Sequence, residues 1–221
     1  KPFIKSIKVD SDKSLSIRSF LIGSICEDIS VAKNVLESED VFSTINCLKK
    51  LGVQIRKKSK SYFIHGKGLG SLFAKKNLNL NFGNSGTLAR LLIGILSTTP
   101  DIEIKIQGDR SLNKRSMKEL IELMSEFGAE FLPKNKFNFF LRFISTEMPI
   151  GIKYKSGISA QLKSAVILAG LNSYGTTEII EEKRSRNHTE NILIKNSQTI
   201  KINMKKKKII KLFGKKYLNP I

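Results

Sequence analysis

Hydrophobic positions recur at a helical period in three similar stretches of this chain. Each stretch begins at a Ser, continues as an apolar run and reaches a Gly: Ser14 to Gly23, Ser85 to Gly94 and Ser159 to Gly170. The glycines lie about 70 to 76 positions apart, a spacing that marks a repeated unit. Because Ser caps helix starts and Gly ends many helices, the pattern predicts three apolar helices that lie inside the protein.

A second helix is expected after each apolar one. These helices follow Ser38, Ser111 and Ser185 and end at Gly52, Gly128 and Asn196. Asn tolerates the left-handed conformation better than most residues, so Asn196 can stand where the other two units use Gly.

Alternating apolar and polar residues then predict pairs of half-buried strands. The expected pairs are 53–56 with 61–65, 129–132 with 137–143, and 199–204 with 208–213. Shorter strands at 102–106 and 177–180 lie between the two helices of a unit. The unit is therefore strand–helix–strand–helix–strand–strand, present three times. With the apolar helices inside and the sheets outside, the three units give an inside-out α/β barrel.

Composition fits a soluble globular protein but leaves one question about charge. The chain has 221 residues, is 40% hydrophobic and carries a formal net charge of +20. Such a charge attracts polyanions. However, Lys outnumbers Arg by 31 to 8, which an AT-rich genome produces without selection for binding, and no nucleic-acid motif is present. The basic run Lys205 to Lys208 lies between two alternating segments and is interpreted as a turn. A nucleic-acid partner is therefore not expected.

Further classes are excluded by what the sequence lacks. No apolar run reaches the roughly 18 residues of a membrane-spanning helix, and no signal peptide is present. Cys26 and Cys47 are the only cysteines, with no zinc-ligand spacing, so neither a disulfide framework nor a metal site is expected. Reduced thiols favour a cytoplasmic location. The chain starts at Lys1 rather than Met, so we do not expect a native N-terminus.

Candidate chemistry lies at the N-terminal ends of the three apolar helices. These ends carry Asp12-Lys13-Ser14 with Arg18, Asn84-Ser85-Gly86-Thr87 with Arg90, and Ser159-Ala160-Gln161. Helix N-termini favour anions, so threefold packing would aim all three at one anionic ligand. Taken singly, each feature has an ordinary explanation: Ser and Thr cap helices, Lys13 and Arg115 can be surface residues, and His188 can be a satisfied polar residue. No hydrolase elbow occurs.

The joint order of the motifs is more specific. Asp-Lys-Ser-x-Ser-x-Arg (12–18), Gly-Asn-Ser-Gly-Thr (83–87), Gly-Asp-x-Ser-Leu-x-x-Arg (108–115), Ser-Ala-Gln (159–161) and Ser-Arg-x-His-Thr-Glu (185–190) follow one another. Together they resemble the enolpyruvyl transferase family, and within it the 5-enolpyruvylshikimate-3-phosphate synthases, from about Ile7 to Pro220. The resemblance implies transfer of the enolpyruvyl group of phosphoenolpyruvate to the 5-hydroxyl of shikimate 3-phosphate, by addition and elimination, with no metal or cofactor.

The resemblance also implies a role for each motif residue. Lys13 and Arg115 would be catalytic. The residues expected to bind shikimate 3-phosphate are Lys13, Ser14, Arg18, Ser159, Ala160, Gln161, Ser185 and Arg186, and those expected to bind phosphoenolpyruvate are Lys13, Asn84, Gly86 and Arg115. Gly86 leaves room for the ligand, and we expect sensitivity to glyphosate. Departures from the family pattern occur at Asp10-Ser11, Ile17, Ser116 and Asn187, which replace Pro-Gly, His, Pro and Asp.

The length differs most from the family. Members are about twice as long and place the active site between two similar domains. The resemblance therefore implies that residues 1–11, with the strand Phe3 to Val9, join a second domain that this chain lacks. Residues 12–221 would be one domain of three repeats, about 12–80, 81–150 and 151–219. The C-terminal half of the enzyme would be the partner, and we expect the chain alone to bind shikimate 3-phosphate weakly without turnover.

Two alternatives remain open. The first is the sister transferase that acts on UDP-N-acetylglucosamine, although Cys26 and Cys47 both lie in helical patterns and neither occupies that enzyme's reactive loop. The second is a polyanion- or RNA-binding module on the same fold, as in the RNA 3′-phosphate cyclases. A steep salt dependence of RNA binding would favour the second alternative.

Overall fold

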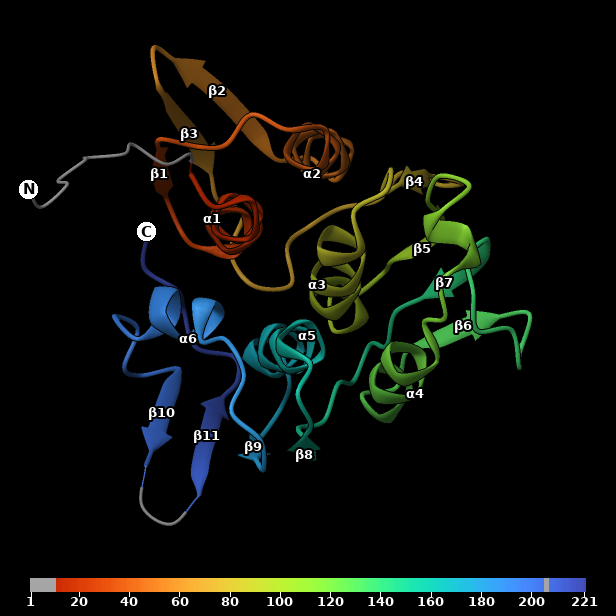
Figure 1. Ribbon diagram of the computed structural model, residues 1–221, viewed down its shortest axis with the longest axis vertical. Helices are drawn as coiled ribbons and strands as arrows, with labels where there is room; N and C mark the ends of the chain where they lie inside the picture. The colour runs from red at the N-terminus through yellow and green to blue at the C-terminus, as the bar shows by residue number, and fades with distance from the viewer. Residues whose placement is uncertain (1–10, 205–206) are drawn as a thin grey trace, which may run out of the picture.

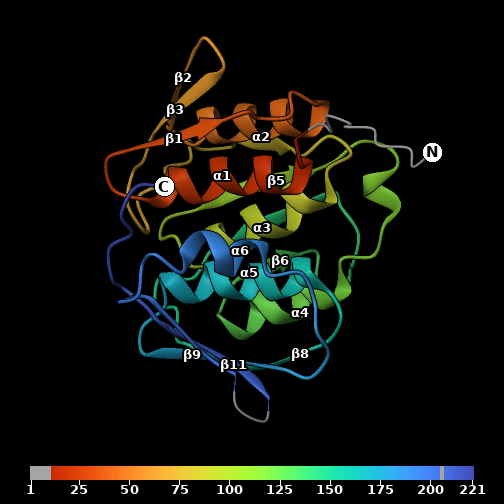
Figure 2. The ribbon, with the colours of Figure 1, turned by 60° about the vertical axis from the view of Figure 1, so that its left-hand side comes forward.

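The computed structural model describes residues 11–204 and 207–221. Three sheets lie at the periphery and the helices lie between them, with α1, α3 and α5 nearest the centre (Figure 1). Seen from the side, these three helices run roughly along one direction (Figure 2). The expected arrangement of sheets outside and apolar helices inside is confirmed. Within the described ranges, no helix combines the length and apolar character needed to cross a membrane.

The first unit contains two helices and a three-stranded sheet. Its elements are α1 (Lys13–Ile25), β1 (Ile29–Lys33), α2 (Glu39–Lys50), β2 (Gln54–Lys58) and β3 (Ser61–His65). The sheet order is β1-β3-β2, and both pairings are antiparallel. The strand expected at Phe3 to Val9 lies outside the described residues.

The second and third units each have the full order of elements. The second consists of β4 (Asn79–Asn81), α3 (Gly86–Ser97), β5 (Glu103–Gln107), a 3₁₀ turn (Leu112–Lys114), α4 (Lys118–Glu126), β6 (Glu130–Leu132) and β7 (Leu141–Ile144). The third consists of β8 (Lys153–Ser156), α5 (Ala160–Leu171), β9 (Thr176–Glu181), α6 (His188–Leu193), β10 (Ile200–Asn203) and β11 (Lys208–Phe213). The sheet orders are β4-β5-β7-β6 and β10-β11-β9-β8, and the strands that flank the first helix of each unit are parallel.

The chain's last residue pairs with the open edge of β1. Units two and three have a parallel strand at the equivalent edge. On β1, the N–H of Val31 donates to the carbonyl of Ile221 over 2.9 Å, and the N–H of Ile221 donates to Ser30 Oγ over 3.1 Å. The C-terminal segment therefore partly occupies the sheet position that a parallel strand fills in the other two units.

The glycines of the apolar helices do not end those helices, contrary to the sequence prediction. Gly23, Gly94 and Gly170 lie inside α1, α3 and α5, and none has a positive φ. They permit close packing instead: a Cβ on Gly94 would lie 2.6 Å from the carbonyl oxygen of Ala165 on α5. The glycine prediction fails because a helix-interior Gly at a tight contact and a terminal Gly look alike in sequence.

Other helix ends agree in part with the predictions. Gly52 and Gly128 have positive φ of 87° and 103° after α2 and α4, as expected. The expectation for Asn196 is wrong, because α6 ends at Leu193 and Asn196 has no positive φ.

Ser85 and Ser159 cap α3 and α5 with their side chains, as predicted. At α1 the cap is Asp12, whose carboxylate accepts from the N–H of Leu15 over 2.6 Å, and Ser14 lies inside the helix.

One predicted strand is shorter than expected. The alternation over 137–143 predicted a strand, but only Leu141–Ile144 pairs with β5. Phe139 is nevertheless buried, and its ring lies 5.6 Å from that of Phe82. Its apolar side chain is therefore explained by core packing outside a sheet ladder. Of the basic run, residues 205–206 lie outside the described residues, and Lys208 begins β11.

Candidate active site

A polar pocket lies where the N-terminal ends of α1, α3 and α5 approach one another. It has a volume of about 340 Å³, and its lining residues are Lys13, Glu39, Asp40, Asn84, Gly86, Thr87, Arg90, Arg115 and Gln161. Five of the residues predicted from the motifs therefore line one pocket: Lys13, Asn84, Gly86, Arg115 and Gln161. Three cations face two carboxylates there, so the pocket carries net positive charge in addition to the helix ends.

Arg90 and Gln161 connect α3 to α5 inside the pocket. Arg90 Nη1 donates to the carbonyl of Gly86 over 3.2 Å and to Gln161 Oε1 over 3.0 Å. Gln161 Nε2 donates in turn to Thr87 Oγ1 over 3.0 Å. Burial lowers the pKa of Arg90, and the neighbouring charge of Arg115 lowers it further. A partly desolvated guanidinium held this way favours the arrival of an anion.

Gly86 provides space beside these cations. A Cβ at this position would lie 2.8 Å from Arg90 Nη1 and 3.6 Å from Arg115 Nη1. Arg115 Nη2 donates to Asn84 Oδ1 over 2.6 Å and to Ser111 Oγ over 3.3 Å. The first turn of α3 is thus surrounded by two guanidinium groups, and a side chain at position 86 would displace one of them.

Four lining residues have no role in the sequence prediction: Glu39, Asp40, Thr87 and Arg90. Arg90 was noted after the second motif but was given no role. Asp40, which with Glu39 begins α2, forms an ion pair with Lys13 over 3.2 Å. The sequence predicts that a helix begins after Ser38, but nothing in the local sequence shows that Glu39 and Asp40 lie beside α1.

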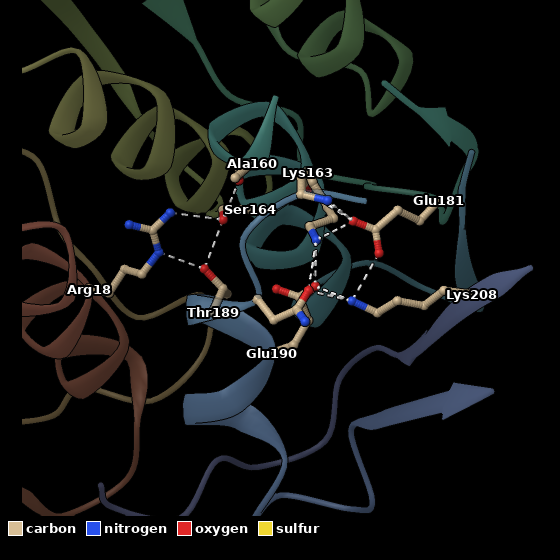
Figure 3. A network of polar contacts seen from close by, with 10 residues as sticks. Arg18, Ala160, Lys163, Ser164, Glu181, Thr189, Glu190 and Lys208 are labelled. Carbon is tan, nitrogen blue, oxygen red and sulfur yellow. Dashed lines mark hydrogen bonds and ion pairs between the residues drawn. The ribbon is translucent and has the colours of Figure 1, made fainter. Parts of the chain in front are cut away.

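Arg18 lies on α1 but is buried away from this lining. Only 2% of it is exposed. Its Nε donates to Thr189 Oγ1 over 2.9 Å and its Nη2 to Ser164 Oγ over 3.2 Å, and Nη1 bonds the carbonyl and hydroxyl of Ser14. Burial lowers the pKa of Arg18. Figure 3 shows the guanidinium turned toward Ser164 and Thr189. The structure therefore brings together Ser14 and Arg18, two residues of the first motif.

The residues of the last two motifs lie around the starts of α5 and α6. Ser159 Oγ accepts from the N–H of Leu162 over 3.3 Å, and the Ala160 carbonyl accepts from Ser164 Oγ over 2.6 Å. Ser185 donates from its N–H and its hydroxyl to Glu181 Oε1, over 2.8 and 2.9 Å. To donate its hydroxyl proton to a phosphate, Ser185 must turn away from Glu181. Arg186 is exposed, and its charge contributes to the lowered pKa of Arg18.

Next to Ser185 lies a buried cluster of four charged side chains: Lys163, Glu181, Glu190 and Lys208 (Figure 3). Lys163 Nζ lies 2.8 Å from Glu181 Oε1 and 2.7 Å from Glu190 Oε1, and its side chain is fully buried. Lys208 Nζ lies 3.0 and 2.9 Å from the same two carboxylates. Burial alone would raise the pKa of Glu181, but hydrogen bonds from Lys163, Lys208 and Ser185 lower it to about 2. The cluster is neutral overall.

His188 has no evident acid–base partner. Its Nδ1 is buried and has no hydrogen-bond partner among the described residues. Burial lowers the pKa of His188, and the positive charge of Arg18 lowers it further. In the part of the chain that the structure describes, no group of three or more His, Cys, Asp or Glu side chains could hold a metal ion.

Three repeated α/β units with a cationic pocket at converging helix ends define an α/β protein whose pocket suits small anions. A sequence model of the family described as EPSP synthase (3-phosphoshikimate 1-carboxyvinyltransferase) matches residues 1–220. The chain therefore belongs to the EPSP synthase family.

Individual relatives agree with this assignment. The chain is 41% identical over 189 residues to the 3-phosphoshikimate 1-carboxyvinyltransferase of Sulfurihydrogenibium sp. (strain YO3AOP1), covering 85% of this chain and 43% of that protein. It is 37% identical over 203 residues to the enzyme of that name from Paramagnetospirillum magneticum, covering 91% and 45%. An EPSP synthase structure from Acinetobacter baumannii superposes with a TM-score of 0.85 at 33% identity, covering 97% of this chain and 48% of that one. The chain thus spans about half the length of these relatives.

Proposed function

We propose that this chain forms the part of a 3-phosphoshikimate 1-carboxyvinyltransferase that binds shikimate 3-phosphate and one side of phosphoenolpyruvate. The enolpyruvyl group would pass to the 5-hydroxyl of shikimate 3-phosphate by addition and elimination, with release of phosphate. The observation that best supports this proposal is the pocket that Lys13, Arg90 and Arg115 line together with Gly86 at the start of α3. Fixed cations and helix N–H groups stabilise anionic ligands and the charge that develops during reaction.

On the phosphoenolpyruvate side, Arg115 and Lys13 are the catalytic residues of the proposal. Arg115 is exposed beside Asn84, so its guanidinium is available to pair with the ligand. Lys13 is half exposed, and its ion pair with Asp40 holds the ammonium at the pocket. Arg90 joins the set as a cation that the motif comparison did not include.

On the shikimate side, Arg18 and Ser14 would take the carboxylate, with Gln161 against the ring. The phosphate would lie among Ser159, the N–H of Ala160, Ser185 and Arg186. Each charge-assisted hydrogen bond of this kind contributes roughly 1.5–3 kcal/mol to binding. Hydrogen bonds hold Arg18 to Thr189 and Ser164, which favours a pre-arranged carboxylate site. The hydroxyl of Ser185 would have to leave Glu181 to reach the phosphate.

The rest of the site would come from a second unit of similar size, since the relatives are about twice as long as this chain. In this proposal the chain alone binds shikimate 3-phosphate weakly and does not complete the transfer. The cytoplasmic location also stays a prediction; both thiols, Cys26 and Cys47, are free and buried.

Isothermal titration of the 221-residue chain with shikimate 3-phosphate, followed by phosphoenolpyruvate, tests the proposal. We expect shikimate 3-phosphate to bind and Arg115→Gln to weaken phosphoenolpyruvate binding about tenfold or more, as expected for a lost charge-assisted bond. Arg56→Gln, which changes an exposed Arg of β2 outside the pocket, is the matched control. Preferential binding of UDP-N-acetylglucosamine, or tighter and steeply salt-dependent binding of RNA, would overturn the proposal. Competition by glyphosate for the phosphoenolpyruvate site tests the role of Gly86.

A further inference from the structure

Two of the side chains that hold Arg18, Thr189 and Ser164, have no predicted binding role. Its guanidinium has five N–H donors. Nε and Nη2 donate to Thr189 and Ser164, and Nη1 bonds Ser14. Because only 2% of Arg18 is exposed, little of the guanidinium is open to a ligand, and its orientation depends on these acceptors.

The hydroxyl groups of Thr189 and Ser164 form a directed chain of hydrogen bonds. Thr189 Oγ1 accepts from Arg18 and donates to Ser164 Oγ over 2.8 Å. Ser164 Oγ also accepts from Arg18, and it donates to the carbonyl of Ala160 over 2.6 Å. Each hydroxyl proton therefore has an acceptor, so the hydroxyl oxygens present lone pairs to Arg18. This series of hydrogen bonds ends at Ala160, in the first turn of α5, and Ala160 is predicted to bind the ligand.

The residues next to Ser164 and Thr189 in the chain hold the two hydroxyl groups within hydrogen-bond distance of each other. Ser164 follows Lys163 on α5, and Glu190 follows Thr189 on α6. Lys163 Nζ lies 2.7 Å from Glu190 Oε1, with both side chains buried. This ion pair fixes α6 against α5 beside the Thr189–Ser164 hydrogen bond. Two consecutive residues on each helix thus set the position of the acceptors for Arg18.

We propose that Thr189 and Ser164 are positioning residues that orient the Arg18 guanidinium toward the carboxylate of the bound shikimate ring. They would act through Arg18 and without touching the ligand. The proposal rests on the proposed function, because that function makes Arg18 the carboxylate partner. It assigns a role to two residues, 171 and 146 positions from Arg18 in the chain, that share its buried environment.

Thr189→Val tests the proposal, because it keeps the shape of the side chain and removes the hydroxyl group. Binding of shikimate and of shikimate 3-phosphate to the 221-residue chain is measured by titration for Thr189→Val, Thr189→Ser, Arg18→Lys and the double variant Arg18→Lys/Thr189→Val. Thr99→Val is the matched control, since Thr99 is equally buried but bonds the carbonyl of Ile95 at the other end of α3. Thermal melting of every variant follows its folding.

We expect Thr189→Val to weaken both ligands by about tenfold, since both carry the carboxylate and one hydrogen bond is lost. Thr189→Ser restores binding to within about twofold. The double variant binds no more weakly than Arg18→Lys, because coupled residues are not additive. Thr99→Val binds as the unsubstituted chain does. If Thr189→Val does not fold, Ser164→Ala replaces it, with the same expectations.

Other outcomes overturn the proposal. Unchanged ligand affinity of the Thr189 variants excludes a role that acts through Arg18. The same role is excluded if Thr189→Val weakens binding as much in the Arg18→Lys variant as in the unsubstituted chain. A loss confined to shikimate 3-phosphate places the effect at the phosphate and also excludes it. If the unsubstituted chain binds neither ligand, the proposed function itself fails, and that result is separate because it needs no variant.

Discussion

Arg90 Nη1 donates a hydrogen bond of 3.0 Å to Gln161 Oε1 and so joins the first turns of α3 and α5. The same nitrogen bonds the Gly86 carbonyl, and Gln161 returns a bond to Thr87. The cation is therefore fixed in the pocket before a ligand arrives. Such preorganisation favours anion binding because few groups need to move on binding.

Gly86→Ala tests whether this fixed cation matters. The new Cβ would lie 2.8 Å from Arg90 Nη1, so the guanidinium must move away from Gln161. We expect phosphoenolpyruvate to bind at least about fivefold more weakly, as expected for the loss of a charge-assisted contact. Stability should fall by no more than about 1 kcal/mol, because the loss of the Arg90 hydrogen bond to Gln161 is the main folding cost. Titration and melting measure the two effects, and unchanged ligand affinity would contradict the prediction.

Gly94→Ala should act on stability. A Cβ at this position would lie 2.6 Å from the Ala165 carbonyl oxygen and 2.9 Å from its Cα, and backbone atoms cannot turn aside. Overpacking of this kind typically costs about 1–3 kcal/mol. Denaturant unfolding measures the loss. Gly157→Ala, where the added Cβ would meet nothing within 4 Å, is the control and should not be destabilised. Equal stability of the two variants would show that α3 and α5 can separate at no cost.

Lys163→Met should lower the free energy of unfolding much more than removal of a surface lysine does. It leaves Glu181 and Glu190 buried with Lys208 as their remaining cation. Breaking a buried charge pair on one side typically costs about 3–5 kcal/mol. Lys211→Met removes a half-exposed partner of Glu178, and exposed pairs contribute about 1 kcal/mol or less. Denaturant unfolding of both variants checks the contrast, and losses of similar size would count against the role assigned to the buried cluster.

The stability of the protein should fall in acid partly because of Glu181. Its pKa is lowered from 4.5 in the unfolded chain to about 2. The ionised carboxylate therefore stabilises the fold fully above about pH 4.5, and this contribution is lost as the pH falls from there toward 2. Melting temperatures at several pH values should show the gap between the unsubstituted chain and Glu181→Gln narrowing below about pH 4.5. Glu182→Gln, at the exposed neighbouring position, should leave the profile unchanged.

The sequence predicts the repeated units well because their apolar pattern is local. The runs after Ser85 and Ser159 are buried on nearly every side, and the alternating segments form strands. The sequence does not show which of two structural roles a residue has when both roles give the same local pattern. Gly94 looked like a helix end and is a close contact between helices, and Asp12 caps α1 two positions before the expected Ser14.

The motifs indicate several residues that line one pocket, but they do not indicate the long-range contacts of these residues. Lys13, Asn84, Gly86, Arg115 and Gln161 line one pocket. Two acceptors of Arg18, Thr189 and Ser164, are more than 140 positions away in the chain, and no pattern near Arg18 indicates them. Lys208 was part of a basic run, yet its side chain is only 10% exposed between two carboxylates. Such partners follow from the packing of α5, α6 and β11, which only the folded chain shows.

The close approach of Gly94 to Ala165 has a consequence for the size of the pocket. Gly94 lies two turns after Gly86 on α3, about 12 Å along the helix at 1.5 Å per residue. Ala165 lies one turn after Gln161 on α5. Because the two backbones already touch at this contact, the separation of the pocket walls carried by Gly86 and Gln161 is set there. The size of the pocket is therefore set partly by a glycine that lies outside its lining.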